Sequence, residues 1–238
     1  MAEVNNNQMN INAMYGNQAG LAFIDQTTIS LNALQRFGLS ELGNYSLVAA
    51  LPLDVGSFGV GLDYFGFEGY NERKIALAYS RKLLENLSIG AQFNFFQLTI
   101  PEYGNQNALN FEIGLISKIL DNLYLGAHLV NPVRADKVSG VEEFPLVFNL
   151  GLLYRPTDKL QLHLEFEKDL DKEENFKIGL DYQVAKILYL RLGAGTGPSN
   201  FSFGLGIDIL DQLRFDFGSA YHNVLGFSPA GGLVYQFK

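Results

Sequence analysis

The chain has 238 residues, of which 47% are hydrophobic and only 18% are charged, enough for one ordinary domain or one large barrel. Its net charge of -8 argues against a nucleic-acid partner, because contacts to phosphates require clustered Lys and Arg. The absence of cysteine excludes disulfides, thiolate zinc sites and a cysteine nucleophile.

The beginning of the chain carries neither a membrane helix nor an export signal that can be recognised. No stretch approaches the roughly 18 consecutive apolar residues of a transmembrane helix. Residues Met1–Val4 lack the charged and apolar regions of a signal peptide, so we expect none in this chain. The 25 glycines, 19 phenylalanines and 12 tyrosines favour strands.

From Thr27 onward, apolar and polar residues alternate, which predicts strands. We expect about 14 antiparallel segments of about ten residues each, the length of a tilted membrane-spanning strand, and a short helix near residues 15–22. The segments are expected to start near Thr28, Tyr45, Ser57, Lys74, Leu87, Ala108, Leu123, Pro145, Leu160, Asn175, Leu188, Asn200, Leu213 and Ala230.

The connections between these segments alternate in length. Short turns such as Asp54–Gly56 alternate with longer stretches at 65–73, 99–107, 131–144, 168–174 and 222–229. Short turns at one end and longer loops at the other are typical of an outer-membrane barrel, with the turns periplasmic and the loops extracellular. The sequence therefore predicts an all-β transmembrane barrel over residues 27–238, located in the outer membrane.

Each predicted strand has an apolar face and a polar face. The apolar face is expected to contact membrane lipid, and its clearest members are Leu160, Leu162, Leu164, Phe166, Phe215 and Phe217. The polar face is expected to line the lumen with a charge network made of Lys159, His163, Glu165, Glu167, Lys177, Asp181, Arg191, Asp208, Arg214 and Asp216. Because the signs nearly balance, this set predicts salt bridges across the interior rather than an ion-selective ring.

The inner face is also rich in glycine, which weakens a strand unless something approaches it closely. We expect residues 1–26 to fill the lumen as a plug that includes Asn17, Gln18 and Gly20. The Asn and Gln side chains of this segment can satisfy polar groups of the lumen. An unpacked leader is the alternative, since Asn/Gln-rich composition is also typical of unfolded segments.

Catalytic and cofactor motifs are not evident. Gly193–Gly197 lacks the lysine and the strand–helix context of a phosphate-binding loop. His163 and Glu165 share a face, but no serine accompanies them. The carboxylates of residues 169–174 fit either a calcium site or a solvated turn with Lys172. We therefore expect a protein that is not an enzyme and has no cofactor.

Several short segments resemble the PorV/PorQ-like outer-membrane proteins of Bacteroidota, within the FadL-like barrels. Gly16–Ala22 is similar to the segment that opens such barrels, except that Gln18 stands where proline is usual. Further similar segments are Phe58–Leu62, Tyr70–Glu72, Leu77–Ser80, Ile89–Gly90, Glu167–Leu170 and Tyr221–Pro229. The resemblance implies a barrel of about 14 strands whose N-terminal segment is tucked inside.

The resemblance implies two alternative functions. PorV-like members act as accessory proteins of a secretion apparatus, whereas FadL-like members pass hydrophobic molecules. A hydrophobic channel should offer apolar pockets, and the predicted inner face is mainly Gly, Asn, Gln and paired charges. The sequence therefore favours the accessory role slightly. The expected partners are membrane lipid and other outer-membrane or secreted proteins, bound through the loops at 65–73 and 131–144.

Overall fold

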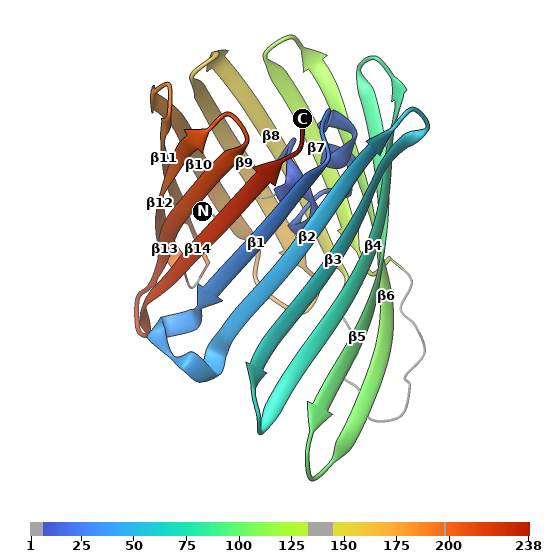
Figure 1. Ribbon diagram of the computed structural model, residues 1–238, viewed down its shortest axis with the longest axis vertical. Coiled ribbons are helices and arrows are strands. Elements are labelled where there is room, and N and C mark those ends of the chain that lie inside the picture. Colours follow the sequence, from blue (N-terminus) through green and yellow to red (C-terminus); the bar gives the residue numbers. More distant parts are fainter. Residues whose placement is uncertain (1–6, 133–144, 198) are drawn as a thin grey trace.

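Fourteen strands close into a single antiparallel barrel in the computed structural model, which describes residues 7–132, 145–197 and 199–238. Every strand pairs with its neighbours in the chain, and β1 pairs with β14 to close the sheet (Figure 1). Ile29 lies opposite Tyr235 and Leu31 opposite Leu233 at this closure. The predicted fold class is therefore confirmed.

The strands begin within a few residues of the positions predicted from alternation. They are β1 Thr28–Gln35, β2 Gly43–Leu53, β3 Gly56–Phe67, β4 Tyr70–Leu84, β5 Leu87–Ile100, β6 Gly104–Leu120, β7 Leu123–Val130, β8 Val147–Thr157, β9 Leu160–Asp169, β10 Asn175–Ala185, β11 Leu188–Gly195, β12 Ser199–Leu210, β13 Leu213–His222 and β14 Gly226–Gln236. Four short 3-10 helices precede or follow β1, namely η1 Ile11–Tyr15, η2 Gln18–Phe23, η3 Arg36–Gly38 and η4 Ser40–Leu42. No helix within the described residues is long and apolar enough to cross a membrane.

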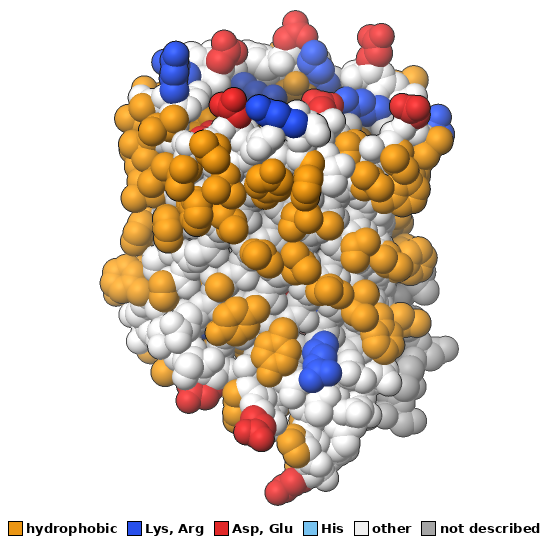
Figure 2. All heavy atoms as spheres, viewed as in Figure 1, with side chains coloured by type: hydrophobic (Ala, Val, Ile, Leu, Met, Phe, Trp, Pro, Cys, Tyr) orange, Lys and Arg blue, Asp and Glu red, His pale blue; other side chains and the backbone are white. Residues whose placement is uncertain are grey.

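Strand alternation separates an apolar outer wall from a buried inner wall. On β9, Leu164 is 49% exposed, whereas its neighbours His163 and Glu165 are only 7% and 5% exposed. The six residues predicted to face lipid all alternate with inward residues in this way: Leu160, Leu162, Leu164 and Phe166 on β9, and Phe215 and Phe217 on β13. Figure 2 shows hydrophobic side chains forming a band over the outer face, with charged side chains gathered at the end that carries the short turns.

At the end of the barrel where longer loops were expected, the strands themselves extend further and short turns join two of the hairpins. The predicted loops at 65–73 and 99–107 are wrong, because β3 and β4 continue to a turn at 68–69, and β5 and β6 to a turn at 101–103. These two hairpins project beyond the barrel rim (Figure 1). The backbone N–H and C=O groups of these hairpins are satisfied because the paired strands continue to form hydrogen bonds with each other. The loop predicted at 131–144 lies mostly outside the described residues.

A substitution at Leu164, which lies in the middle of the outward-facing side of β9, tests whether the outer band contacts lipid. Leu164→Arg should lower the free energy of unfolding by about 2–4 kcal/mol, since that is the cost of arginine at the bilayer midplane. The matched control is Leu170→Arg, in the loop after β9, where leucine is 51% exposed. Urea titration in lipid vesicles, read by the mobility of unheated samples on SDS gels, measures both. Equal effects of the two substitutions would contradict the assignment of the outer face.

Candidate functional site

The N-terminal segment forms two short helices because its asparagines cap them. The Asn10 side chain accepts a hydrogen bond from the Asn12 backbone N–H at 2.9 Å, and the Asn17 side chain accepts one from that of Ala19 at 3.1 Å. Side chains at a helix start commonly satisfy backbone N–H groups in this way. The asparagine-rich composition that is also typical of unfolded leaders thus has a local structural role here.

Glycines of the barrel wall allow this segment to approach the backbone of the strands. A Cβ added at Gly59 would lie 2.4 Å from the sulfur of Met14, and one at Gly90 would lie 2.5 Å from the Ala19 nitrogen. A Cβ at Gly114 would lie 2.0 Å from the Asn17 side-chain oxygen. All three distances are far below van der Waals contact, so β3, β5 and β6 accommodate the segment only where the wall has no side chain.

Apolar contacts hold one side of the segment. Ile11, Met14 and Leu21 pack in a buried cluster with wall residues that include Val48 and Ala76. A second cluster joins Ala19 to three wall residues, Ile116, Tyr124 and Leu153. The interior is therefore more apolar than the sequence predicted, because apolar residues lie among polar ones on the inner face.

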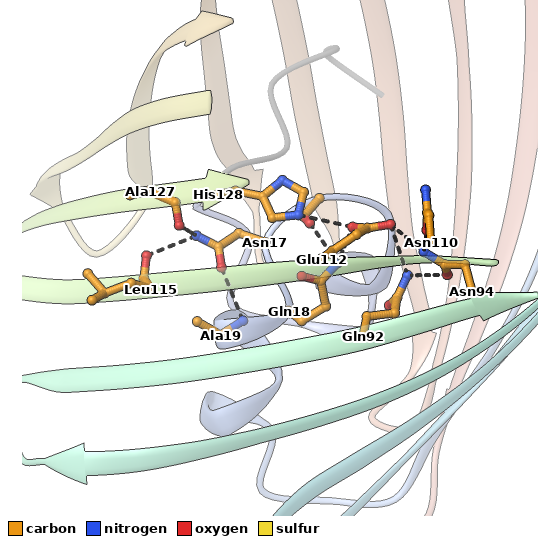
Figure 3. Close-up of polar contacts among 11 residues, drawn as sticks. Asn17, Gln18, Ala19, Gln92, Asn94, Asn110, Glu112, Leu115, Ala127 and His128 are labelled. Carbon is orange, nitrogen blue, oxygen red and sulfur yellow. Dashed lines mark hydrogen bonds and ion pairs between the residues drawn. The ribbon is translucent and has the colours of Figure 1, made fainter. Parts of the chain in front are cut away.

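A carboxylate on β6, Glu112, gathers the polar contacts of the other side (Figure 3). Gln18 Nε2 donates a hydrogen bond of 2.7 Å to one of its oxygens, and Asn94 Nδ2 donates one of 2.6 Å to the other. His128 Nε2 lies 3.0 Å from the oxygen that Gln18 also reaches. Glu112 thus links the N-terminal segment to β5 and β7, and hydrogen bonds to a charged group contribute about 1.5–3 kcal/mol each.

Asn17 adds a second polar anchor through the strand backbone. Its Nδ2 donates hydrogen bonds of 3.0 Å to the carbonyl oxygens of Leu115 on β6 and Ala127 on β7 (Figure 3). Asn17 and Gln18 are fully buried, and Gly20 is buried beside them. The three residues expected to form the plug therefore all contact the interior, where Asn17 and Gln18 make hydrogen bonds to the wall and Gly20 leaves room for the Gln8 carbonyl.

The predicted charge network lies on the opposite wall, from β9 to β13. Lys177 Nζ pairs with Glu165 at 3.0 Å and with Glu167 at 2.9 Å. Arg191 pairs with Asp181 at 2.9 Å and also with Asp216. Arg214 makes two hydrogen bonds to Asp208, of 2.5 and 2.9 Å. Eight of the ten predicted residues thus meet as ion pairs, which removes the penalty of leaving single charges buried.

The other two predicted residues lie outside these pairs. Lys159 is a correction, because β9 begins one residue later and leaves Lys159 exposed in the turn at the barrel end. His163 faces the interior and borders a cavity that Arg155 and Asp181 also line. That cavity, of about 160 Å³, lies between residues 7–12 and the wall, and a second of about 390 Å³ lies toward the short-turn end. Both are polar enough to hold water.

The carboxylates of the loop after β9 are engaged by lysines. Lys172 pairs with Asp169 and Lys168 with Glu174, both at 2.9 Å. The hydrogen bond that Lys172 donates to Asp169 raises the pKa of Lys172, and the one that Lys168 donates to Glu174 lowers the pKa of Glu174. Within the described residues, no group of three His, Cys, Asp or Glu side chains is arranged to hold a metal ion. The loop matches the solvated-turn alternative.

Glu112 and His128 were not among the predicted site residues, although alternation places both on the inner face. The sequence does contain an indication of this site. Glu112 is a single carboxylate among inner positions that are rich in amides, namely Gln92 and Asn94 on β5 and Asn110 on β6. A pairing register between β5 and β6 was needed to bring them together, and alternation does not supply one.

Comparisons with solved structures give the same architecture. The chain is similar to the Ralstonia pickettii toluene transporter TbuX, with a TM-score of 0.71 and 10% identity over 96% of this chain and 94% of that one. It is similar to the Pseudomonas putida toluene transporter TodX, with a TM-score of 0.70 and 12% identity over 98% and 94%. A Pseudomonas aeruginosa FadL homologue gives 0.64 and 14% over 99% and 95%.

No protein-family model matches the sequence, and no curated protein matches it either. At 10–14% identity, the likeness to TbuX, TodX and the FadL homologue shows the fold alone. The expected resemblance to FadL-like barrels is thus supported at the level of architecture. The narrower resemblance to PorV/PorQ-like proteins of Bacteroidota stays a prediction.

The Glu112 anchor predicts how the N-terminal segment is held. Met14→Cys, at a position only 2% exposed in a chain without other cysteines, should react slowly with a maleimide. Adding Glu112→Gln should speed that reaction about tenfold, because the hydrogen bonds from Gln18 and Asn94 lose their charged acceptor. Tyr103→Cys, at a residue 80% exposed, is the control that should react quickly in both backgrounds. Rapid labelling of Met14→Cys alone would contradict a docked segment.

Proposed function

We propose that this chain is a FadL-like outer-membrane channel for small hydrophobic compounds, in which residues 27–238 form the barrel and residues 1–26 a plug. The architecture shared with the toluene transporters TbuX and TodX supports this reading. So does the outward apolar band, which suits a bilayer. The proposed location is the outer membrane, with the projecting hairpins outside and the short turns in the periplasm.

One observation carries the proposal: the plug meets the wall through apolar surface as well as through hydrogen bonds. Ile11, Met14 and Leu21 cover Val48 and Ala76. If the plug moves, this wall surface becomes available inside the barrel. A small apolar compound gains free energy by covering it, because it removes apolar area from water. Hydrophobic passage would therefore be coupled to displacement of the plug.

The accessory role, which the sequence favoured slightly, is less well supported than the channel. It rested on an inner face without apolar lining, and the two buried clusters of the interior change that premise. Of the two loops expected to bind a protein partner, 65–73 is a paired hairpin with a tight turn. Membrane lipid remains the partner we propose, and a protein partner becomes an outcome of the test.

Uptake measured with a locked plug tests this function. A Cβ at Gly59 would touch the Met14 sulfur, so the pair Met14→Cys and Gly59→Cys is placed to form a disulfide between plug and β3. Cells expressing the wild-type chain should accumulate radiolabelled toluene faster than cells without it. In cells with the oxidised double variant, most of this additional uptake should be lost, and a reductant should restore it.

The single variant Met14→Cys, treated with the same oxidant, controls for damage by the oxidant. Wild-type uptake no faster than that of cells lacking the chain would overturn the channel. Stoichiometric co-purification of another protein in mild detergent, together with no uptake, would favour the accessory role.

A further inference from the structure

The outer wall of the barrel carries an apolar groove over β1 to β5, β13 and β14. Pairing across neighbouring strands aligns outward residues in rows, and one row contains Leu31, Leu47, Leu62, Ile75 and Phe95 on β1 to β5. Together with residues of β13 and β14, this row lines a hollow of about 920 Å³. A hollow of this volume on a membrane-facing wall is large enough to take up hydrocarbon chains.

Small residues form the floor of the groove. In the adjoining row, Gly231 on β14 pairs with Ala33 on β1, and these two lie between the larger Phe217 and Tyr45. A Cβ added at Gly231 would meet no atom within 4 Å. The same row continues from Tyr45 to Tyr64 and then to Arg73 on β4. The groove is therefore shallow and apolar at its floor and ends in a cation.

Arg73 lies at the rim of the apolar band on the side of the projecting hairpins. On β5 and β6, Phe95 and Leu109 are followed by Gln97 and Asn107, whose amides form a hydrogen bond of 3.4 Å. Gln97 is also the β5 residue opposite Arg73. The wall thus changes from apolar to polar at the level of Arg73, where lipid headgroups begin.

A second arginine on β4 marks the other edge of the apolar band, so the distance between the two arginines measures its thickness. Arg81 is eight residues further along β4, toward the short-turn end, and the outward residues between the two arginines are Ile75, Leu77 and Tyr79. Eight residues span about 26 Å along a strand, or about 20 Å across the membrane at the usual tilt. The two arginines therefore fit opposite interfaces of one bilayer.

The charge of Arg73 has no carboxylate to balance it among the described residues. Its side chain is exposed, it takes part in none of their ion pairs, and its cross-strand neighbours Tyr64 and Gln97 are uncharged. A cation on a lipid-facing wall is costly in hydrocarbon and inexpensive beside anions at the interface. Guanidinium groups bind phosphate in a two-pronged geometry, which makes a lipid phosphate a suitable counter-ion.

We propose that this groove binds the lipid A portion of lipopolysaccharide, with acyl chains over Gly231 and Ala33 and a phosphate at Arg73. The occupant must carry several acyl chains and a phosphate at the outer interface. Lipid A combines both, and the proposed orientation, on which this inference rests, places Arg73 in the outer leaflet on the side of the projecting hairpins. Such a site would fix the depth of the barrel in the membrane and the lipid that surrounds it. Its function does not depend on the passage of compounds through the lumen.

Native mass spectrometry of the full chain in detergent, titrated with hexa-acylated lipid A carrying two phosphates, tests the site. Arg73→Gln should weaken binding about tenfold, because a charge-assisted contact to phosphate is lost. It should not change binding of the same lipid after its phosphates are removed. Gly231→Leu should weaken binding of both lipids by filling the floor, and Ala33→Leu replaces it if the first variant does not fold.

Arg81→Gln is the matched control, since it removes the same charge at the opposite interface and should leave binding of lipid A unchanged. All variants are first checked for the heat-dependent mobility of a folded barrel. Equal binding by wild type and Arg73→Gln would overturn the proposal, as would an equal loss in Arg81→Gln. Competition by phosphatidylglycerol as effective as by lipid A itself would overturn the choice of lipid.

Discussion

The close approach of the N-terminal segment to glycines of the wall is the contact on which the rest of the interior depends. A closed sheet of 14 strands encloses more space than its own inward side chains fill on the side of β2 to β7. Gly59, Gly90 and Gly114 let the segment lie directly against the strands. Without it, a glycine-lined wall and the carboxylate of Glu112 would face an open lumen.

The interior is consequently divided into two halves with different chemistry. On one side the segment is held by apolar contacts and by the hydrogen bond from Gln18 to Glu112. On the other, Arg191 on β11 pairs with Asp181 on β10 and with Asp216 on β13, so that ion pairs join these strands. This division fits the proposed channel, in which opening would require only the segment to move.

The fold could be predicted from the sequence because alternation has a period of two on every strand, and the starts of β1, β5, β7 and β9 match to the residue. Ion pairs such as Lys177 with Glu165 were predictable because they join neighbouring strands. The projecting hairpins were missed because polar residues can pair as strands beyond a membrane. Glu112 was missed because its contacts depend on the pairing registers of β5 to β7 and on Gln18, which is 94 residues away in the chain.

Single-channel conductance in planar bilayers, with and without residues 1–26, measures directly whether the lumen is closed by the chain's own N-terminal segment. The full chain should conduct weakly, because the segment packs against the wall and lies between the lumen's polar cavities, such as those of about 390 and 160 Å³. The shortened chain, verified as a folded barrel by its heat-dependent mobility, should conduct several-fold more. A large conductance that is the same for both chains would contradict a plugged barrel and indicate an open pore.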